Sequence, residues 1–391
     1  MDTQNTPIHI SLWHADFWIL AIANLLITMS VYMLIPVLPV WMFSVAGLSQ
    51  HEVGIVMGAY GIGLFVFGGF CNWYVQRYRR NRVCLWAMVG VFFALLGCWL
   101  VENEIQHSWL QYRLLLFLRI ALGAAFGLVQ MVLSSTLIID KSESFQRTEA
   151  NHASAWFGRF ALSLGPMLGI VFARTTSSPL LASSILALAA FILLATVKFP
   201  FRTPEDGVKR FSGDRFFLPE AKWLFVNLFL ICLSVGLLMS TQFTAMFYAM
   251  VMVGFCVALL AERFAFVDAD LRSQVVAGSI LIAIALVMIL TRKQMIVNYI
   301  SPVLVGLGVG LIGSRFLLFF IKLSKHCQRG TAVSTYMLSW ESGLATGLFV
   351  GYFFFADQIR LALSASLACI MLAFALYVLF THQWYIKKKN R

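Results

Sequence analysis

The sequence predicts an all-α membrane protein with twelve transmembrane helices arranged in two six-helix halves. The chain of 391 residues is 60% hydrophobic and only 12% charged, whereas roughly a quarter of the residues of a soluble protein are charged. Its mean hydropathy is +0.84. Because one crossing takes roughly 20 apolar residues, this length accommodates about twelve crossings with short turns. No room is left for a large soluble domain.

Six apolar spans of transmembrane length lie in the first half of the chain. They cover residues 17–43, 53–75, 83–101, 114–139, 150–173 and 180–197. The first span lacks the basic leader and the small-residue cleavage site of a signal peptide. We therefore expect it to remain in the protein as the first helix.

Six further spans lie in the second half. They cover residues 223–241, 245–261, 273–290, 295–321, 331–355 and 359–380. Residues 223–261 carry no charge, and a single helix of that length would extend about 58 Å, roughly twice the thickness of the hydrocarbon core. The polar run Ser240, Thr241 and Gln242 predicts a tight turn there, between two helices.

A charged stretch at residues 198–222 divides the spans six and six. It contains Pro200, Pro204, Gly207, Gly213 and Pro219, which are typical of a loop. We therefore predict an N-terminal half (1–199), a cytoplasmic linker (200–219) and a C-terminal half (220–391).

The basic residues predict the orientation of the chain. If both termini are cytoplasmic, the inside segments hold 21 Lys and Arg and the outside loops hold five, as the positive-inside rule requires. The net charge of +12 therefore needs no nucleic-acid partner. We expect a multi-pass monomer of the cell inner membrane, with the lipid bilayer around it.

Several function classes are not expected. The seven cysteines are scattered and form no disulfide or zinc pattern. The sequence has no phosphate loop, no metal-binding histidine spacing and no recognisable nucleophile arrangement. We therefore predict that the protein is not an enzyme and uses no metal, no cofactor and no ATP.

A shift of 182 residues indicates an internal repeat. Gln146 and Arg147 coincide with Gln328 and Arg329, and several small residues coincide as well. In this register Arg159 corresponds to Glu341.

Four charged residues lie deep within apolar spans. Glu341 is the only such carboxylate, and Arg119, Arg159 and Arg315 are the basic ones. Charges at this depth normally face a cavity or the interior of the bundle. Arg315 either lines a cavity or extends along its helix toward the inside.

Glu341 and Arg159 can be interpreted in two ways. In the first, Glu341 carries a proton, while Arg159 holds its charge or binds an anionic part of the substrate. In the second, they form a permanent structural ion pair that joins the two halves. In both, we expect the two side chains to approach each other across a central cavity.

Polar and aromatic residues within the spans are candidates for the cavity wall, and a glycine and proline motif indicates a helix that moves. The candidate cavity residues are Asn24, Thr28, Tyr32, Gln130, His152, Trp156, Asn227, Ser234, Tyr336 and Trp340, although each is also explained as a contact between helices. Gly165, Pro166 and Gly169 suit a gating helix. A simple proline kink is the alternative.

Several of these motifs resemble those of the major facilitator superfamily, and in particular its twelve-helix drug-proton antiporter branch. The entry to the first helix, the basic loop 72–82 and two intrahelical motifs carry the resemblance. Their residues are Asp16, Phe17, Asn24, Tyr32, Pro36, Pro39, Arg77, Arg80, Arg82, Arg119, Gly123, Gly127, Gly165, Pro166 and Gly169. The loop departs from the family pattern where Gln76 occupies the usual Asp position.

The resemblance implies roles for some of these residues. Arg119 would take part in proton coupling. Gln76, Arg77 and Arg80 would act in conformational gating, and the Gly165 motif would favour export.

We therefore expect a proton-coupled exporter of a small amphipathic or lipophilic compound that works by alternating access. One alternative is a symporter that imports a sugar, a peptide or an organic anion. Another is a membrane receptor or assembly factor without transport.

Overall fold

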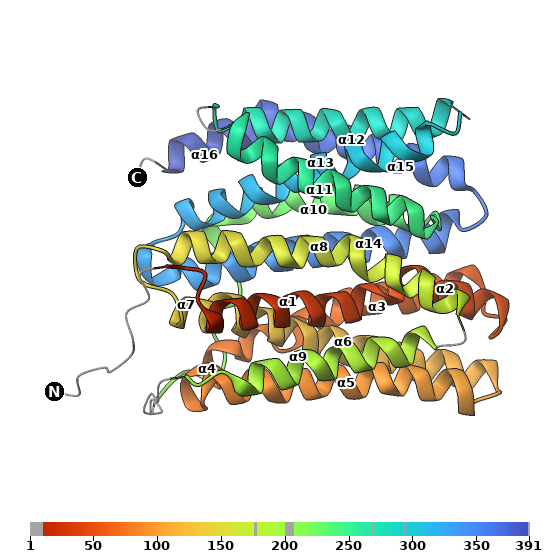
Figure 1. Ribbon diagram of the computed structural model, residues 1–391, viewed down its shortest axis with the longest axis horizontal. Helices are drawn as coiled ribbons and strands as arrows, with labels where there is room; N and C mark the ends of the chain where they lie inside the picture. The colour runs from red at the N-terminus through yellow and green to blue at the C-terminus, as the bar shows by residue number, and fades with distance from the viewer. Residues whose placement is uncertain (1–10, 176–177, 200–206, 267–268, 293, 390–391) are drawn as a thin grey trace.

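The computed structural model describes residues 11–175, 178–199, 207–266, 269–292 and 294–389. Its helices lie side by side in one bundle (Figure 1). The first seven residues of the predicted linker, 200–206, lie outside the described residues.

Six helical segments form the N-terminal half. They consist of α1 (Ala15–Tyr32) with α2 (Leu34–Ser44), α3 (Gln50–Val66) with α4 (Cys71–Arg77), α5 (Arg80–Glu104), α6 (Ser108–Val132) with α7 (Ile138–Asp140), α8 (Arg147–Arg174) and α9 (Pro179–Thr196).

Six more segments form the C-terminal half. They consist of α10 (Lys222–Met239), α11 (Ala245–Phe264), α12 (Ser273–Thr291), α13 (Val297–Leu323), α14 (Arg329–Phe355) and α15 (Ile359–Leu376) with α16 (His382–Lys389). A helix covers most of each predicted span, so the predicted all-α fold is confirmed. The predicted turn between α10 and α11 is confirmed too, and Gln242 takes a positive φ of 55° there.

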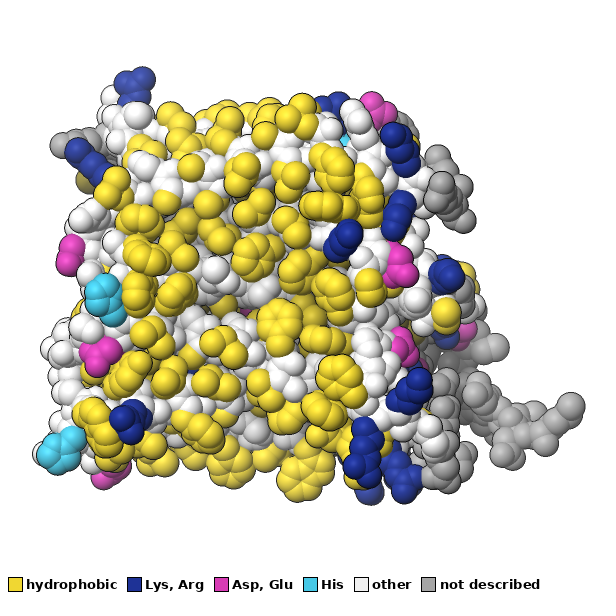
Figure 2. Space-filling view, turned by 180° about the vertical axis from the view of Figure 1, so that it is seen from behind, with side chains coloured by type: hydrophobic (Ala, Val, Ile, Leu, Met, Phe, Trp, Pro, Cys, Tyr) yellow, Lys and Arg dark blue, Asp and Glu magenta, His cyan; other side chains and the backbone are white. Residues whose placement is uncertain are grey.

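Among the described residues, eleven of the twelve segments are long and apolar enough to cross a membrane. The exception among the described residues is α14. It contains serines, threonines, glycines and Glu341 along its length, and most of them are buried inside the bundle. Figure 2 shows the apolar belt on one face of the molecule, with Lys and Arg gathered mainly at one end.

That end is the one where α1 begins and α16 lies, at the left of Figure 1; we call it the terminal end. The other end is called the opposite end. The most extensive contacts between the halves are those of α3 with α14 and of α8 with α11. Counted along the chain, α3 and α14 are the second and eleventh crossings, and α8 and α11 are the fifth and eighth. The internal repeat relates each crossing of the first half to the sixth crossing after it, so it relates these two contacts to each other.

Close contacts between the halves occur toward both ends of the bundle. Toward the opposite end, Gly58 and Gly61 of α3 lie so close to Phe349 and Ala345 of α14 that a Cβ atom would approach the side chains to within 2.8 and 2.9 Å. At the terminal end, Gly330 lies against the backbone of Ser135. The halves are therefore in contact toward both ends of the bundle.

Candidate functional site

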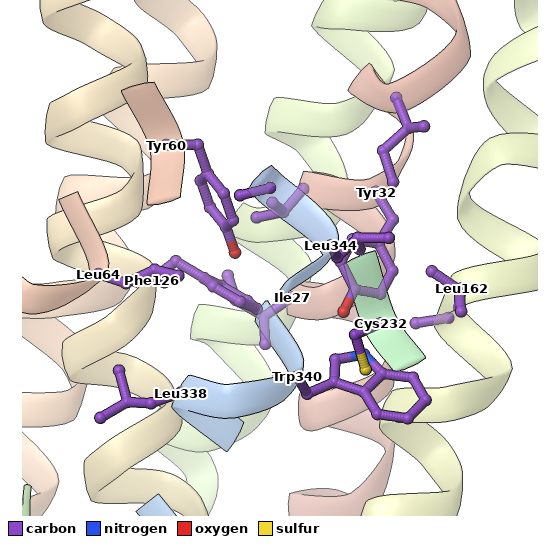
Figure 3. Close-up of a cluster of buried hydrophobic side chains, with 14 of the residues drawn as sticks. Ile27, Tyr32, Tyr60, Leu64, Phe126, Leu162, Cys232, Leu338, Trp340 and Leu344 are labelled. Atoms are coloured by element: carbon purple, nitrogen blue, oxygen red, sulfur yellow. The ribbon is translucent and has the colours of Figure 1, made fainter. Parts of the chain in front are cut away.

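Glu341 is the centre of the candidate site. It lies in the middle of α14 and is only 2% exposed. Tyr32 donates a hydrogen bond of 2.5 Å to its Oε1 atom, and Tyr60 donates one of 2.9 Å to its Oε2 atom. Figure 3 shows the two hydroxyls on either side of α14, with Trp340 and Leu344 nearby. Two helices of the N-terminal half therefore bind one carboxylate of the C-terminal half.

The position of Tyr32 follows from a break in the first crossing. Pro36 has no N–H group, so it cannot bond to the carbonyl of Tyr32, and α1 ends at that residue. Gly165 of α8 lies behind the break, where a Cβ atom would approach the Met29 carbonyl to within 2.9 Å and the Tyr32 Cβ to within 3.1 Å. Close packing of α8 thus places the Tyr32 side chain.

The position of Tyr60 depends on α6. Gly123 of α6 packs directly on the Tyr60 carbonyl and leaves no room for a side chain. Arg119, one turn earlier, donates to the carbonyls of Val56 and Met57 at 3.4 and 3.3 Å. Its guanidinium lies 5.1 Å from the centre of the Tyr60 ring. Among the described contacts, the predicted coupling arginine therefore lies next to Tyr60 and not next to Glu341.

Arg159 is buried in a neighbouring aromatic environment. It is 3% exposed and stacks on Trp156 at 4.0 Å. Its Nη1 atom donates to the carbonyl of Gly310 at 3.1 Å, and its Nη2 atom has no hydrogen-bond partner among the described residues. Arg159 and Glu341 are both thirteenth in their helices, as the 182-residue shift requires, but the ion pair expected between them is absent from the described contacts of this conformation.

Aromatic side chains connect Arg159 to the Glu341 site. The Arg159 stem, Trp340 and the Tyr336 hydroxyl all crowd against Gly313 of α13. Trp340 also lies beside the Tyr32 hydroxyl (Figure 3). Of the predicted cavity residues, Tyr32, Trp156, Tyr336 and Trp340 therefore lie together around the two buried charges.

Three more predicted cavity residues form a polar cluster inside the N-terminal half. Gln130 of α6 donates to Asn24 and Thr28 of α1, at 3.2 and 3.0 Å. Asn24 in turn donates to the backbone of Ser154 in α8, at 3.1 Å. The cluster joins three helices that meet next to the interface between the halves.

His152 joins the two halves nearer the terminal end. Its Nε2 atom lies 2.5 Å from the Ser314 hydroxyl and 3.6 Å from the Glu262 carboxylate. Glu262 was not among the predicted site residues because it stands near the end of its span, where a charge normally reaches water. Its place beside Arg263, in a stretch that resembles the basic loop 72–82, is the sequence signal that could have found it.

Asn227, Ser234 and Arg315 lie in contacts with peripheral helices. Asn227 and Ser234 of α10 donate to backbone carbonyls of α15. Arg315 donates from Nε to Gln274 of α12 at 2.8 Å. The structure does not bring these three residues together with Glu341. The alternative explanation of helix packing describes the contacts of Asn227 and Ser234, whereas Arg315 packs against α12.

The predicted gating residues fall into two groups. Gly165 and Gly169 pack on the backbone at the α1–α2 break, with Pro166 between them in α8. Arg80 forms an ion pair of 2.9 Å with Asp140 at the terminal end, whereas Gln76 is half-buried and Arg77 is exposed at the end of α4.

Little free space remains around the buried charges. One cavity beside Glu341 and Gln130 and another beside Trp340 and Cys232 each have a volume of about 10 Å³. Neither can hold more than a water molecule. These two cavities therefore leave no room for a solute beside the buried charges in this conformation.

Comparison with known proteins identifies the fold. A family model described as Major Facilitator Superfamily matches residues 20–348. No curated protein sequence matches the chain.

Several solved structures have the same architecture. The human organic anion transporter MFSD10 (TETRAN) has a TM-score of 0.69 and 14% sequence identity, and the match covers 92% of this chain and 98% of that one. The xylose transporter XylE from E. coli, in a partially occluded inward open conformation, has a TM-score of 0.68 and 13% identity over 93% and 98% of the chains. A bacterial homologue of the iron transporter ferroportin, in the outward-facing state, has a TM-score of 0.68 and 14% identity over 97% and 100%. At these identities the likeness shows the fold alone.

Proposed function

This chain belongs to the major facilitator superfamily, and we propose that it couples export of a small amphipathic compound to the movement of protons. Membership of the superfamily makes it a multi-pass membrane transporter and not an enzyme. Glu341 carries the proton. The two halves rock about this residue and open the site to one side of the membrane at a time.

The observation that carries the proposal is the bonding of the Glu341 carboxylate. Both of its oxygens accept hydrogen bonds from neutral tyrosines, and no ion pair of the described residues includes it. A carboxylate in a permanent salt bridge stays ionised, whereas one with neutral partners can gain or lose a proton when its surroundings open. Because both tyrosines belong to the other half, separation of the halves removes these partners.

The bonding of Arg159 supports an anionic group on the substrate. Its buried Nη2 atom has no hydrogen-bond partner among the described residues, and a substrate acid would supply the missing acceptor. The surrounding Trp156, Tyr336 and Trp340 suit an apolar or aromatic body. The same geometry favours the second candidate, a symporter that imports an organic anion, because Arg159 is equally suited to that substrate.

The proposed orientation places both termini and the linker in the cytoplasm. The excess of Lys and Arg at the terminal end supports it (Figure 2). Reporter fusions after Gly207 and after Lys389 test the orientation. Periplasmic activity of either fusion would reverse every statement about sidedness.

Transport measured in proteoliposomes tests the proposal. The purified chain is reconstituted with a pH-sensitive dye inside, and a panel of aromatic acids, lipophilic cations and sugars is offered under an imposed pH gradient. We expect transport of an aromatic acid to change the pH inside the vesicles. The direction of that pH change relative to the movement of the acid distinguishes export by antiport from import by symport. Glu341→Gln should bind this compound but no longer respond to the gradient, because an amide carries no exchangeable proton.

Glu143→Gln is the matched control, since Glu143 lies half-buried in the loop between α7 and α8 at the terminal end and should leave coupling intact. If Glu341→Gln still accumulates the compound against its gradient by using protons, another group carries them. If no compound of these classes moves, the proposed substrate class is wrong.

A further inference from the structure

A separate cavity lies between the two halves at the terminal end. Its volume is about 210 Å³, and arginines from four different segments line it. They are Arg80 at the start of α5, Arg147 at the start of α8, Arg215 in the linker and Arg329 at the start of α14. We call this cavity the arginine pocket.

The charges in the arginine pocket do not balance. Asp140 neutralises Arg80, and Asp214 accepts hydrogen bonds from the Thr331 hydroxyl and the Arg215 backbone. None of the ion pairs in the described part of the chain includes Arg147, Arg215 or Arg329. The Nε atoms of Arg147 and Arg215 are buried with no hydrogen-bond partner there.

Backbone N–H groups add to this positive field. Arg147 and Arg329 are the first residues of α8 and α14, and neither helix has a side-chain cap at that end. Uncapped helix N-termini present free N–H groups and the positive end of the helix dipole to an anion. The internal repeat therefore brings two corresponding helix N-termini to one cavity, of which α8 carries Glu149 in its first turn and α14 carries no acidic residue there.

The linker completes the arginine pocket. Arg215 donates to the Thr136 hydroxyl at 3.0 Å, and its backbone N–H donates to the Thr331 hydroxyl at 2.9 Å. Burial, and then the nearby Arg80, lower the pKa of the Arg215 guanidinium. An anion bound beside it would offset that repulsion.

We infer that the arginine pocket binds a phosphate group, either of a free phosphate compound or of an anionic lipid, and thereby bridges the two halves and holds the terminal end closed. A volume of 210 Å³ corresponds to roughly seven waters at about 30 Å³ each, which is enough for a phosphate or diphosphate with a few waters. Guanidinium groups bind phosphate oxygens through paired hydrogen bonds. This inference does not depend on the proposed role of Glu341.

Cys327 provides a direct probe of occupancy. It lines the arginine pocket and is exposed, so a neutral maleimide can reach it. The full chain is purified in a neutral detergent, and labelling of Cys327 is followed by mass spectrometry with pyrophosphate or with chloride at the same ionic strength. We expect pyrophosphate to slow the labelling about tenfold or more.

Arginine variants test whether the pocket is responsible. In Arg147→Gln and Arg329→Gln, pyrophosphate should bind about tenfold more weakly, since each variant loses hydrogen bonds between charged groups. Arg174→Gln, at the other end of α8, should behave as the wild type. If a Gln variant does not fold, Arg147→Lys takes its place, because it keeps the charge but loses the paired hydrogen bonds and should give intermediate protection.

Nanodiscs distinguish the two sources of phosphate. Protection by pyrophosphate in detergent indicates a soluble anion. Protection that arises only in phosphatidylglycerol nanodiscs, and not in phosphatidylcholine nanodiscs, indicates a lipid headgroup. Equal labelling rates under all these conditions, or equal protection in the Gln variants, would overturn the inference.

Discussion

Tyr60 and Tyr32 bind the two oxygens of one buried carboxylate from two different helices. A buried charged group that loses one hydrogen-bond donor is destabilised by about 1–3 kcal/mol. We therefore expect Tyr60→Phe to lower the free energy of unfolding by this amount. In a Glu341→Gln background the same substitution should cost clearly less, because the acceptor is no longer charged.

Thermal unfolding of the four proteins in this double-mutant cycle measures the coupling between the two residues. Tyr74→Phe, on a half-buried tyrosine of α4, serves as the control and should show no coupling to Glu341. Additive effects of Tyr60→Phe and Glu341→Gln would mean that the hydrogen bond between the two residues contributes nothing to the free energy of unfolding.

Arg159 and Glu341 permit a second test. A permanent ion pair predicts that Arg159→Glu combined with Glu341→Arg restores folding and transport. In this structure their hydrogen bonds go to different partners, so we expect the swapped protein to be no more active than either single variant. Uptake into vesicles measures the result, and recovery of wild-type flux would establish the structural pair instead.

These residues also show how far sequence reasoning reaches. Glu341 could be found because a carboxylate in the middle of an apolar span is costly and therefore exceptional. Tyr60 could not be found in this way, because tyrosines are common in membrane helices and nothing in its neighbourhood indicates its partner. Glu262 was missed because its position along the span says nothing about which way the helix faces.

At the scale of elements, the close approach of α8 to α1 is the contact that positions Tyr32. Gly165→Ala places a methyl group against the Met29 carbonyl and the Tyr32 Cβ. We expect a loss of about 1–3 kcal/mol of stability, together with reduced transport. Gly158→Ala in the same helix is the matched control, because its new methyl group meets only Asn24 at 3.7 Å.

Thermal unfolding measures the stability of both variants, and flux into vesicles measures their transport. A Gly165→Ala protein with wild-type stability and activity would show that α8 can shift freely against α1. Equal damage in the Gly158→Ala protein would show that the effect does not come from the contact of α8 with α1, since Ala by itself favours a helix over Gly.

The helices themselves were largely predictable, because apolar length marks each crossing whatever its neighbours are. The breaks within the helices were less predictable. The first and second crossings were expected as single helices, but each is divided, at Met33 and at residues 68–70. Pro36 explains the first break, whereas the second follows from tertiary packing, since Phe216 and Phe211 of the linker cover Gly68 and Gly69.

For the whole molecule, alternating access requires the halves to move as bodies. Cysteines introduced at Gly61 and Ala345 would join α3 to α14, since their Cβ atoms would lie 2.9 Å apart, within a small shift of disulfide geometry. In a Cys256→Ser, Cys327→Ser background, oxidation should stop transport and reduction should restore it. Flux before and after reduction is the measurement.

Cysteines at Gly90 and Ala125 provide the control within one half. Their Cβ atoms would lie 3.1 Å apart between α5 and α6, so oxidation should leave transport unchanged. Transport that continues with the first pair oxidised would exclude separation of α3 from α14, and with it the rocking motion.

The polarity of α14 has a consequence for biogenesis. A helix with a carboxylate at its centre and so many hydroxyls enters a bilayer poorly by itself, since an acidic residue at that depth costs about 2.5–3.5 kcal/mol during translocon-mediated insertion. Its most extensive partner, α10, emerges from the ribosome earlier, and so does α3, which carries Tyr60. The newly made α14 therefore depends on helices already in the membrane to accept it, and completion of the Glu341 site coincides with its integration.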